Sequence, residues 1–165
     1  MKETKELIVV RSLTESDLGI FAAHRASARS KQRAININAA VARRLFSKAF
    51  IDKGGGPVEC LCRLGNIEVS GKRHIGKIHK NWRLGGSKIP GDAFSRLDSR
   101  DFMLLRSVEQ NDGTKQLKIT FVGRKTNRVV HAGLVAIVQP VLDNSMVVYV
   151  EGQEEFADLA PHCNA

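Results

Sequence analysis

The sequence has few aromatic residues, few cysteines and no long apolar run, and each shortage argues against a class of protein. Aromatic residues make up 5% of the 165 residues, with one Trp and one Tyr. No run approaches the roughly 20 apolar residues that a membrane-spanning helix needs. Residues 2–6 are polar or charged and are followed by only a short apolar run, which is not typical of a secretory signal. We therefore expect a cytoplasmic protein without a membrane partner.

The three cysteines follow neither a disulfide pattern nor a zinc pattern. Cys60 and Cys62 lie two residues apart in a predicted strand, so their side chains point to the same face. Such a pair could form half of a metal site, but no second pair follows at zinc spacing. We predict two small buried thiols in a reducing compartment, and no metal or other cofactor.

Acidic residues are scarce in one part of the chain. Residues 24–88 contain 15 Lys or Arg against 3 Asp or Glu, whereas the remainder contains 11 against 14. Two stretches have no acid at all: residues 24–33 hold four Lys or Arg and residues 72–88 hold six. A merely solvated basic surface is one interpretation, but the asymmetry favours a basic face and a polyanionic partner. Both stretches also hold residues that can read base edges, so DNA is a suitable partner.

The hydrophobic pattern predicts a single, mainly β domain over residues 1–165. Apolar and β-branched residues alternate or cluster near residues 7–10, 34–37, 58–64, 67–69, 102–108, 117–121, 129–138 and 146–150. The sequence Asn-Asp-Gly at residues 111–113 is typical of a hairpin turn. One amphipathic helix is expected near residues 39–50, with Asn38 as its cap. Many short strands with one helix favour a barrel or sandwich, with both basic stretches in long loops.

Catalytic chemistry has only weak support. A metal-dependent nuclease using Asp92, Asp98 and Asp101, or His74 and His79, is one alternative, but neither set has a spacing typical of nucleases. The histidines lie among cations that would repel a divalent metal. An RNA-binding barrel is a second alternative, but it would need exposed aromatic residues for base stacking. We therefore expect no enzymatic activity.

The single tryptophan, Trp82, lies inside the second basic stretch. It could anchor the base of a loop, or contact a nucleotide sugar or base. We favour the anchoring role.

The order of the motifs resembles that of a known family. A first strand precedes LTESDLG at residues 13–19, and a long segment carrying His24 leads to QRAINI at residues 32–37. A helix ending in RLF at residues 44–46 follows, then RHIGK at residues 73–77 and FMLL at residues 102–105. Over residues 7–125 the chain resembles the B3-like DNA-recognition domains of restriction endonucleases, of the EcoRII N-terminal effector-binding type.

The resemblance implies an open seven-stranded β-barrel, or pseudobarrel, with one or two short helices and two arms that grip the DNA major groove. The N-arm would be residues 12–34 and the C-arm about residues 73–92. Two features depart from the family pattern. The N-arm is about five residues longer, with residues 26–30 inserted, and Asn81 stands where the effector domain has an acidic residue. Glu accepts a hydrogen bond from cytosine, whereas Asn pairs with adenine, which allows a different recognition sequence.

The implied function is sequence-specific binding of double-stranded DNA without catalysis, as in a recognition or effector domain of a restriction-modification system. Base contacts are expected from His24, Arg25, Gln32, Arg33, Lys77, His79, Asn81 and Arg83. Phosphate contacts are expected from Arg29, Lys31, Lys72, Arg73, Lys80 and Lys88.

Overall fold

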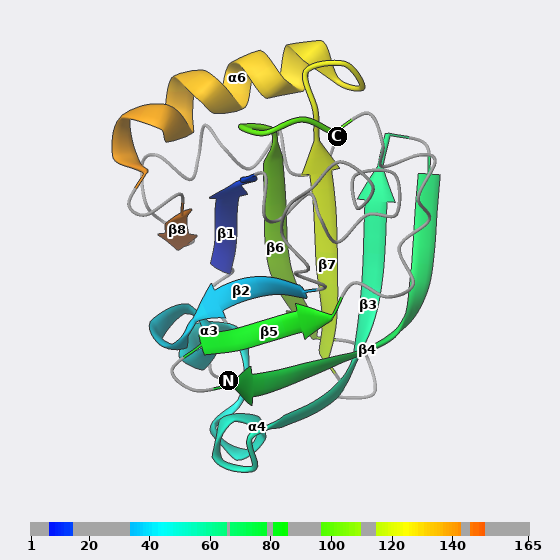
Figure 1. The fold of residues 1–165 in the computed structure, drawn as a ribbon, viewed down its shortest axis with the longest axis vertical. Coiled ribbons are helices and arrows are strands. Elements are labelled where there is room, and N and C mark those ends of the chain that lie inside the picture. Colours follow the sequence, from blue (N-terminus) through cyan, green and yellow to red (C-terminus); the bar gives the residue numbers. More distant parts are fainter. Residues whose placement is uncertain are drawn as a thin grey trace.

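One curled sheet with a few short helices makes up the described part of the chain (Figure 1). A computed structural model describes residues 7–14, 34–65, 67–78, 81–85, 97–109, 115–142 and 146–150. The strands are β1 (Leu7–Ser12), β2 (Ala34–Asn38), β3 (Gly55–Leu64), β4 (Ile67–Ile78), β5 (Asn81–Gly85), β6 (Phe102–Glu109), β7 (Lys115–Val122) and β8 (Met146–Val150). The helices are α3 (Ala39–Leu45), α4 (Lys48–Asp52), α6 (Arg128–Val138) and the 3-10 helix η1 (Gln139–Val141).

The sheet has the strand order β2-β5-β4-β3-β7-β6-β1-β8. Strands β3 and β7 pair in parallel, and every other described pair is antiparallel. In Figure 1, β2, β5 and the end of β4 run across the direction of β3, β7 and β6, so the sheet curls into an open half-barrel. The prediction of a mainly β, open and barrel-like fold is confirmed, with eight strands in the described sheet where seven were expected.

The two faces of the sheet carry separate hydrophobic cores. On β6, Met103 and Leu105 point into the larger core, and Phe102 and Leu104 point into the smaller one. This division follows from the alternation of side chains along a strand. Helix α6 covers the smaller core with Leu134.

The single helix predicted at residues 39–50 is in fact two helices. The expected cap is confirmed, since Oδ1 of Asn38 accepts a hydrogen bond from the backbone N of Val41 at 2.8 Å. The chain leaves the helical conformation at Phe46, whose φ and ψ are −116° and 157°. Ser47 then caps α4 by accepting a hydrogen bond from the N of Phe50 at 3.3 Å. A second N-cap residue in mid-segment therefore divides the helix.

The strand predicted at residues 129–138 is wrong, because this segment is helix α6. Its valines favour a strand by propensity. However, the buried positions His131, Leu134 and Val138 recur at spacings of three and four, which is the stripe of a helix packed on a surface. Val129, outside that stripe, is 82% exposed. Packing against the sheet therefore overrides local propensity.

The second basic stretch is mostly a hairpin, so the prediction of a long loop is wrong there. Strand β4 continues to Ile78 and pairs antiparallel with β5. The loop was predicted from three glycines and a proline in residues 83–91, but only Gly85 of these lies in the described part, as the last residue of β5. The hairpin predicted around residues 111–113 is confirmed by the pairing of Glu109 with Lys115. The assignment of one domain stays a prediction.

Candidate nucleic-acid interface

The β4–β5 hairpin is held against helix α4 by Trp82. This side chain is 1% exposed and pairs across the hairpin with Lys77. Its ring stacks on Phe50 with 6.0 Å between centroids, and Phe50 in turn lies 4.8 Å from the ring of Phe46. Such aromatic pairs add roughly 0.5–1.5 kcal/mol each beyond area burial. The prediction that Trp82 anchors the basic stretch is confirmed, and the hairpin has a fixed base.

Four polar side chains of the hairpin are exposed to solvent: Lys72, His74, Lys77 and Arg83. Strand alternation explains the first two, since their neighbours Arg73 and Ile75 are buried. Arg83 pairs with Gly76, two residues after His74, which places Arg83 on the face of His74. The three cations form no ion pair with any other described residue. They are therefore available to an anionic partner.

Arg73 differs from Lys72, the other predicted phosphate contact in the described part of the chain, because the Arg73 side chain is only 7% exposed. It lies beside the buried thiols of Cys60 and Cys62 and forms a hydrogen bond with Cys62. Burial raises the pKa of both thiols, to about 12 for Cys60, and the Arg73 charge acts in the opposite direction. Nη1 of Arg73 is buried without a hydrogen-bond partner among the described residues. Arg73 therefore belongs to the core side of β4, and not to its exposed cations.

The two thiols confirm the expectation of small buried cysteines at positions 60 and 62. Within the described part of the chain, no three His, Cys, Asp or Glu side chains lie close enough to hold a metal ion. Both sulfur atoms stay protonated near neutral pH, so they act there as apolar groups.

Most of the remaining predicted contacts lie outside the described residues: His24, Arg25, Arg29, Lys31, Gln32, Arg33, His79, Lys80 and Lys88. For Asn81 the structure describes the backbone, which pairs with Ile78 and Asn38. Their roles stay predictions.

Residues 15–33 and 86–96 lie outside the described structure, and the described residues that flank the two segments lie next to one another at both ends. At one end, Ala34 pairs with Gly85 at the edge of the sheet. At the other, the N of Leu13 donates to the O of Asp101 at 2.7 Å, and the N of Arg100 donates to the O of Leu13 at 2.8 Å. The first basic stretch and the segment that carries Lys88 are therefore attached side by side.

The carboxylates that the nuclease alternative would use, Asp92, Asp98 and Asp101, do not share one environment in the structure. Asp101 is fully buried and accepts hydrogen bonds from the N of Asp98 at 2.7 Å and the N of Arg124 at 3.2 Å. Its Oδ1 also lies 3.4 Å from Nε2 of His131. Asp98 pairs with Lys125 at 3.3 Å, and Asp92 lies outside the described residues. Asp101 thus joins backbone and side chains of three segments, which is a structural role.

Two solved structures match this arrangement of strands. The N-terminal domain of Helicobacter pylori LlaJI.R1 has a TM-score of 0.52 and 13% sequence identity, over 87% of this chain and 97% of that chain. The B3 domain of the UbaLAI restriction endonuclease, in a structure with cognate DNA, has a TM-score of 0.53 and 9% identity, over 89% and 87%. The chain has a B3-like fold. This confirms the open β-barrel that the resemblance implied, whereas the two arms stay a prediction.

No protein-family model and no curated protein matches the sequence. In the described part of this B3-like fold, none of the helices has the length and apolar character needed to cross a membrane.

From the sequence, His74 could hydrogen-bond a phosphate or base or be an idle surface residue, and it was not among the expected DNA contacts. The structure places it on the exposed face of β4, between Lys72 and the position opposite Arg83. The signal that could have found it is the period of two along residues 72–77, because a strand with Ile75 buried exposes residues 72 and 74.

Proposed function

We propose that the chain is a sequence-specific, double-stranded DNA-binding domain whose β4–β5 hairpin reads base edges in the major groove. The observation that carries this proposal is a set of exposed cations without ion-pair partners among the described residues: Lys72 and Arg83 on the His74 face of the hairpin, and Lys77, which pairs with Trp82, on the other face. In the major groove of B-DNA each base pair presents a distinct pattern of donors and acceptors, which Arg and Asn side chains can read. The B3-like fold supports the same partner, since the UbaLAI B3 domain was determined with cognate DNA.

The first basic stretch supplies the second half of the proposed grip. His24, Arg25, Gln32 and Arg33 contact bases there, and Arg29 and Lys31 contact phosphates. Ala34, the first described residue after this stretch, pairs with Gly85 of the hairpin strand β5. The two halves are therefore joined through backbone hydrogen bonds, which supports a common binding surface.

Different side chains of the hairpin have different tasks. Arg83 donates two hydrogen bonds to a guanine, and Asn81 pairs with an adenine, each worth roughly 1–3 kcal/mol of discrimination. Lys77 and His79 contact neighbouring bases. Lys72, Lys80 and Lys88 bind phosphates, which supplies affinity without sequence preference. Arg73, being buried, stays behind this surface.

The domain has no catalytic role in this proposal, and serves as the recognition or effector part of a restriction-modification system. Incubation of the protein with plasmid DNA and Mg²⁺ or Mn²⁺ is expected to leave the plasmid intact. Specific cleavage that an Asp98→Asn substitution abolishes would instead favour the nuclease alternative.

Selection from a randomised duplex library at about physiological salt, with RNA as competitor, tests the main proposal. We expect a consensus of a few base pairs. Equal binding of all duplexes would contradict sequence specificity, and a preference for the RNA competitor would favour the RNA-binding alternative.

A pair of substitutions tests the division of tasks on the selected duplex. Arg83→Ala is expected to lose discrimination at one base pair, whereas Lys72→Ala weakens binding to all sequences equally. Circular dichroism of both variants checks that the fold is kept. A uniform loss of affinity in both variants would show that Arg83 contacts phosphate and not a base.

A further inference from the structure

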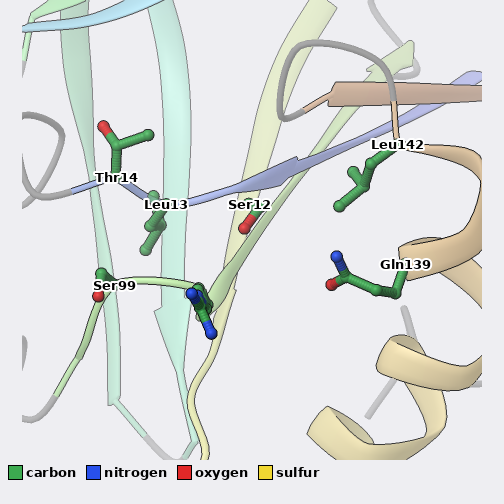
Figure 2. Close-up of a pocket in the computed structure, with 7 residues that line it drawn as sticks. Ser12, Leu13, Thr14, Ser99, Gln139 and Leu142 are labelled. Carbon is green, nitrogen blue, oxygen red and sulfur yellow. The ribbon is translucent and has the colours of Figure 1, made fainter.

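A cavity of about 630 Å³ lies between the end of β1 and the helices α6 and η1 (Figure 2). Five of the residues that line it are polar: Ser12, Thr14, Ser99, Arg100 and Gln139. Figure 2 shows Ser12 and Gln139 on facing sides of the space. Among the described residues no carboxylate lines the cavity, and the hydroxyl, amide and guanidinium groups there can all donate hydrogen bonds. Such a lining suits an anion.

Arg100 is held at the rim of this cavity in an unfavourable backbone conformation. Its φ is 73°, and it is the only non-glycine residue with a positive φ among the described residues. The bond from its N to the O of Leu13, at 2.8 Å, and the bond from Asp101 to Asp98, at 3.1 Å, define this turn. Strain of this kind persists where the surrounding structure enforces it, and often lies at functional sites.

The charge of Arg100 is uncompensated within the described part of the chain, where its side chain forms no ion pair. Its neighbour Arg124 provides the contrast. Nε of Arg124 lies 3.5 Å from Oδ1 of Asp101, and Nη2 donates to the O of Ser99 at 3.1 Å. The C-terminal end of α6 adds about half a negative charge near Gln139, which the full charge of Arg100 exceeds.

We propose that this cavity binds a phosphate group of the DNA backbone, outside the bases that the hairpin reads. The inference rests on the proposed function. Thr14 is the last described residue before the first basic stretch, and Leu97 is the first described residue after the segment that carries Lys88. The cavity therefore lies where both segments are attached. Arg100, with the hydroxyl of Ser12 and the amide of Gln139, would hold a strand that those segments bring to it.

The salt dependence of duplex binding tests the site. Each phosphate contact contributes roughly 0.9 to the slope of log K against log salt concentration. Arg100→Gln is expected to lower this slope by about that amount, and to weaken all duplexes equally. Arg128→Gln is the matched control, because it removes the same charge from an exposed position at the start of α6. Equal slopes in the wild type and both variants would overturn the inference.

A glycine variant separates binding from folding. Arg100→Gly removes both the side chain and the backbone strain, so it is expected to raise the Tm while lowering DNA affinity several-fold. If Arg100 does not contact DNA, the variant has the higher Tm with unchanged affinity, which would overturn the site.

A failure of the DNA-binding proposal can be distinguished from a failure of the phosphate site. If the wild-type protein binds no duplex, the DNA proposal falls, and titration with inorganic phosphate then decides the cavity. An increase of Tm with phosphate that Arg100→Gln abolishes would support an anion site for a free ligand. No increase of Tm would overturn it.

Discussion

The imidazole of His74 lies across the backbone of Gly76. A Cβ atom at position 76 would lie 2.9 Å from Nε2 of His74, which is closer than real Cβ contacts, and a tight 3.3 Å from Cδ2, so the ring would have to move. Gly76 pairs with Arg83 on the neighbouring strand. The missing side chain at position 76 therefore determines where the His74 ring lies on the face that also carries Arg83.

We expect the exposed His74 ring, on the same face as Arg83, to contact the duplex. Gly76→Ala, which displaces the ring, should then weaken binding of the selected duplex by about three- to tenfold, or roughly 0.7–1.4 kcal/mol. Gly71→Ala is the matched control in the same strand, because a Cβ there meets nothing within 4 Å. Fluorescence anisotropy measures both affinities. If the two alanine variants bind alike, the ring position does not matter for binding. Combining Gly76→Ala with His74→Ala should add nothing beyond His74→Ala alone.

Asp101→Asn is expected to lower the free energy of unfolding by about 2–4 kcal/mol, because it leaves buried donors with a weaker acceptor. The carboxylate is 0% exposed and lies 3.5 Å from Nε of Arg124. Asp98→Asn breaks only the exposed pair with Lys125, and should change stability by less than about 1 kcal/mol. Urea unfolding compares them. A similar, small loss in both variants would contradict the structural role of Asp101.

The buried thiols predict a loss of stability at alkaline pH. Burial raises the pKa of Cys60 from 9.0 to about 12. Between these values the unfolded chain has lost the thiol proton while the native state keeps it, so raising the pH favours unfolding. The free energy of unfolding of the wild type should fall more steeply above pH 9 than that of Cys60→Ala. Parallel pH curves for the two proteins would show that the thiol is not buried as described.

The same burial predicts slow chemical modification. In a Cys163→Ser variant, Cys60 and Cys62 should react with a thiol reagent at pH 8 only after unfolding, because the native thiols hold almost no thiolate. Rapid reaction of the native protein would contradict the protonated, buried state of the pair.

Gly55→Ala is expected to destabilise the protein more than Gly54→Ala. Both residues have positive φ, 81° for Gly54 and 102° for Gly55, so both variants carry backbone strain of roughly 1 kcal/mol or more. At Gly55 a Cβ would also collide with the carbonyl oxygen of Ile75 in β4, whereas at Gly54 it meets nothing within 4 Å. Thermal unfolding ranks the two variants. Equal Tm values would show that β3 and β4 can separate there without loss.

Local pattern was sufficient for several parts of this fold. Alternation placed β2 and β7, apolar runs placed β1 and β6, and the amide of Asn38 marked the start of α3. Charge counting identified residues 72–88 as a basic stretch, and the hairpin formed by its described part exposes Lys72, Lys77 and Arg83. These features depend on neighbours a few residues away, so the sequence alone carries them.

Contacts between distant segments decided the rest. Residues 129–138 have strand propensity, but the sheet face formed by β1, β6 and β7 selects the helical stripe of His131, Leu134 and Val138. Arg73 and Lys72 are adjacent cations in the sequence, and only the pairing of β4 with β3 sends Arg73 toward the thiols and Lys72 to solvent. Arg100 became a candidate anion ligand only when its turn met Leu13, about 90 residues earlier. By itself, then, the sequence determined the class of fold, the basic character and the first and last strands, because these follow from local periodicity and composition. The tertiary structure decided which cations remain exposed and which segments share a cavity, because burial depends on residues brought together from far apart in the chain.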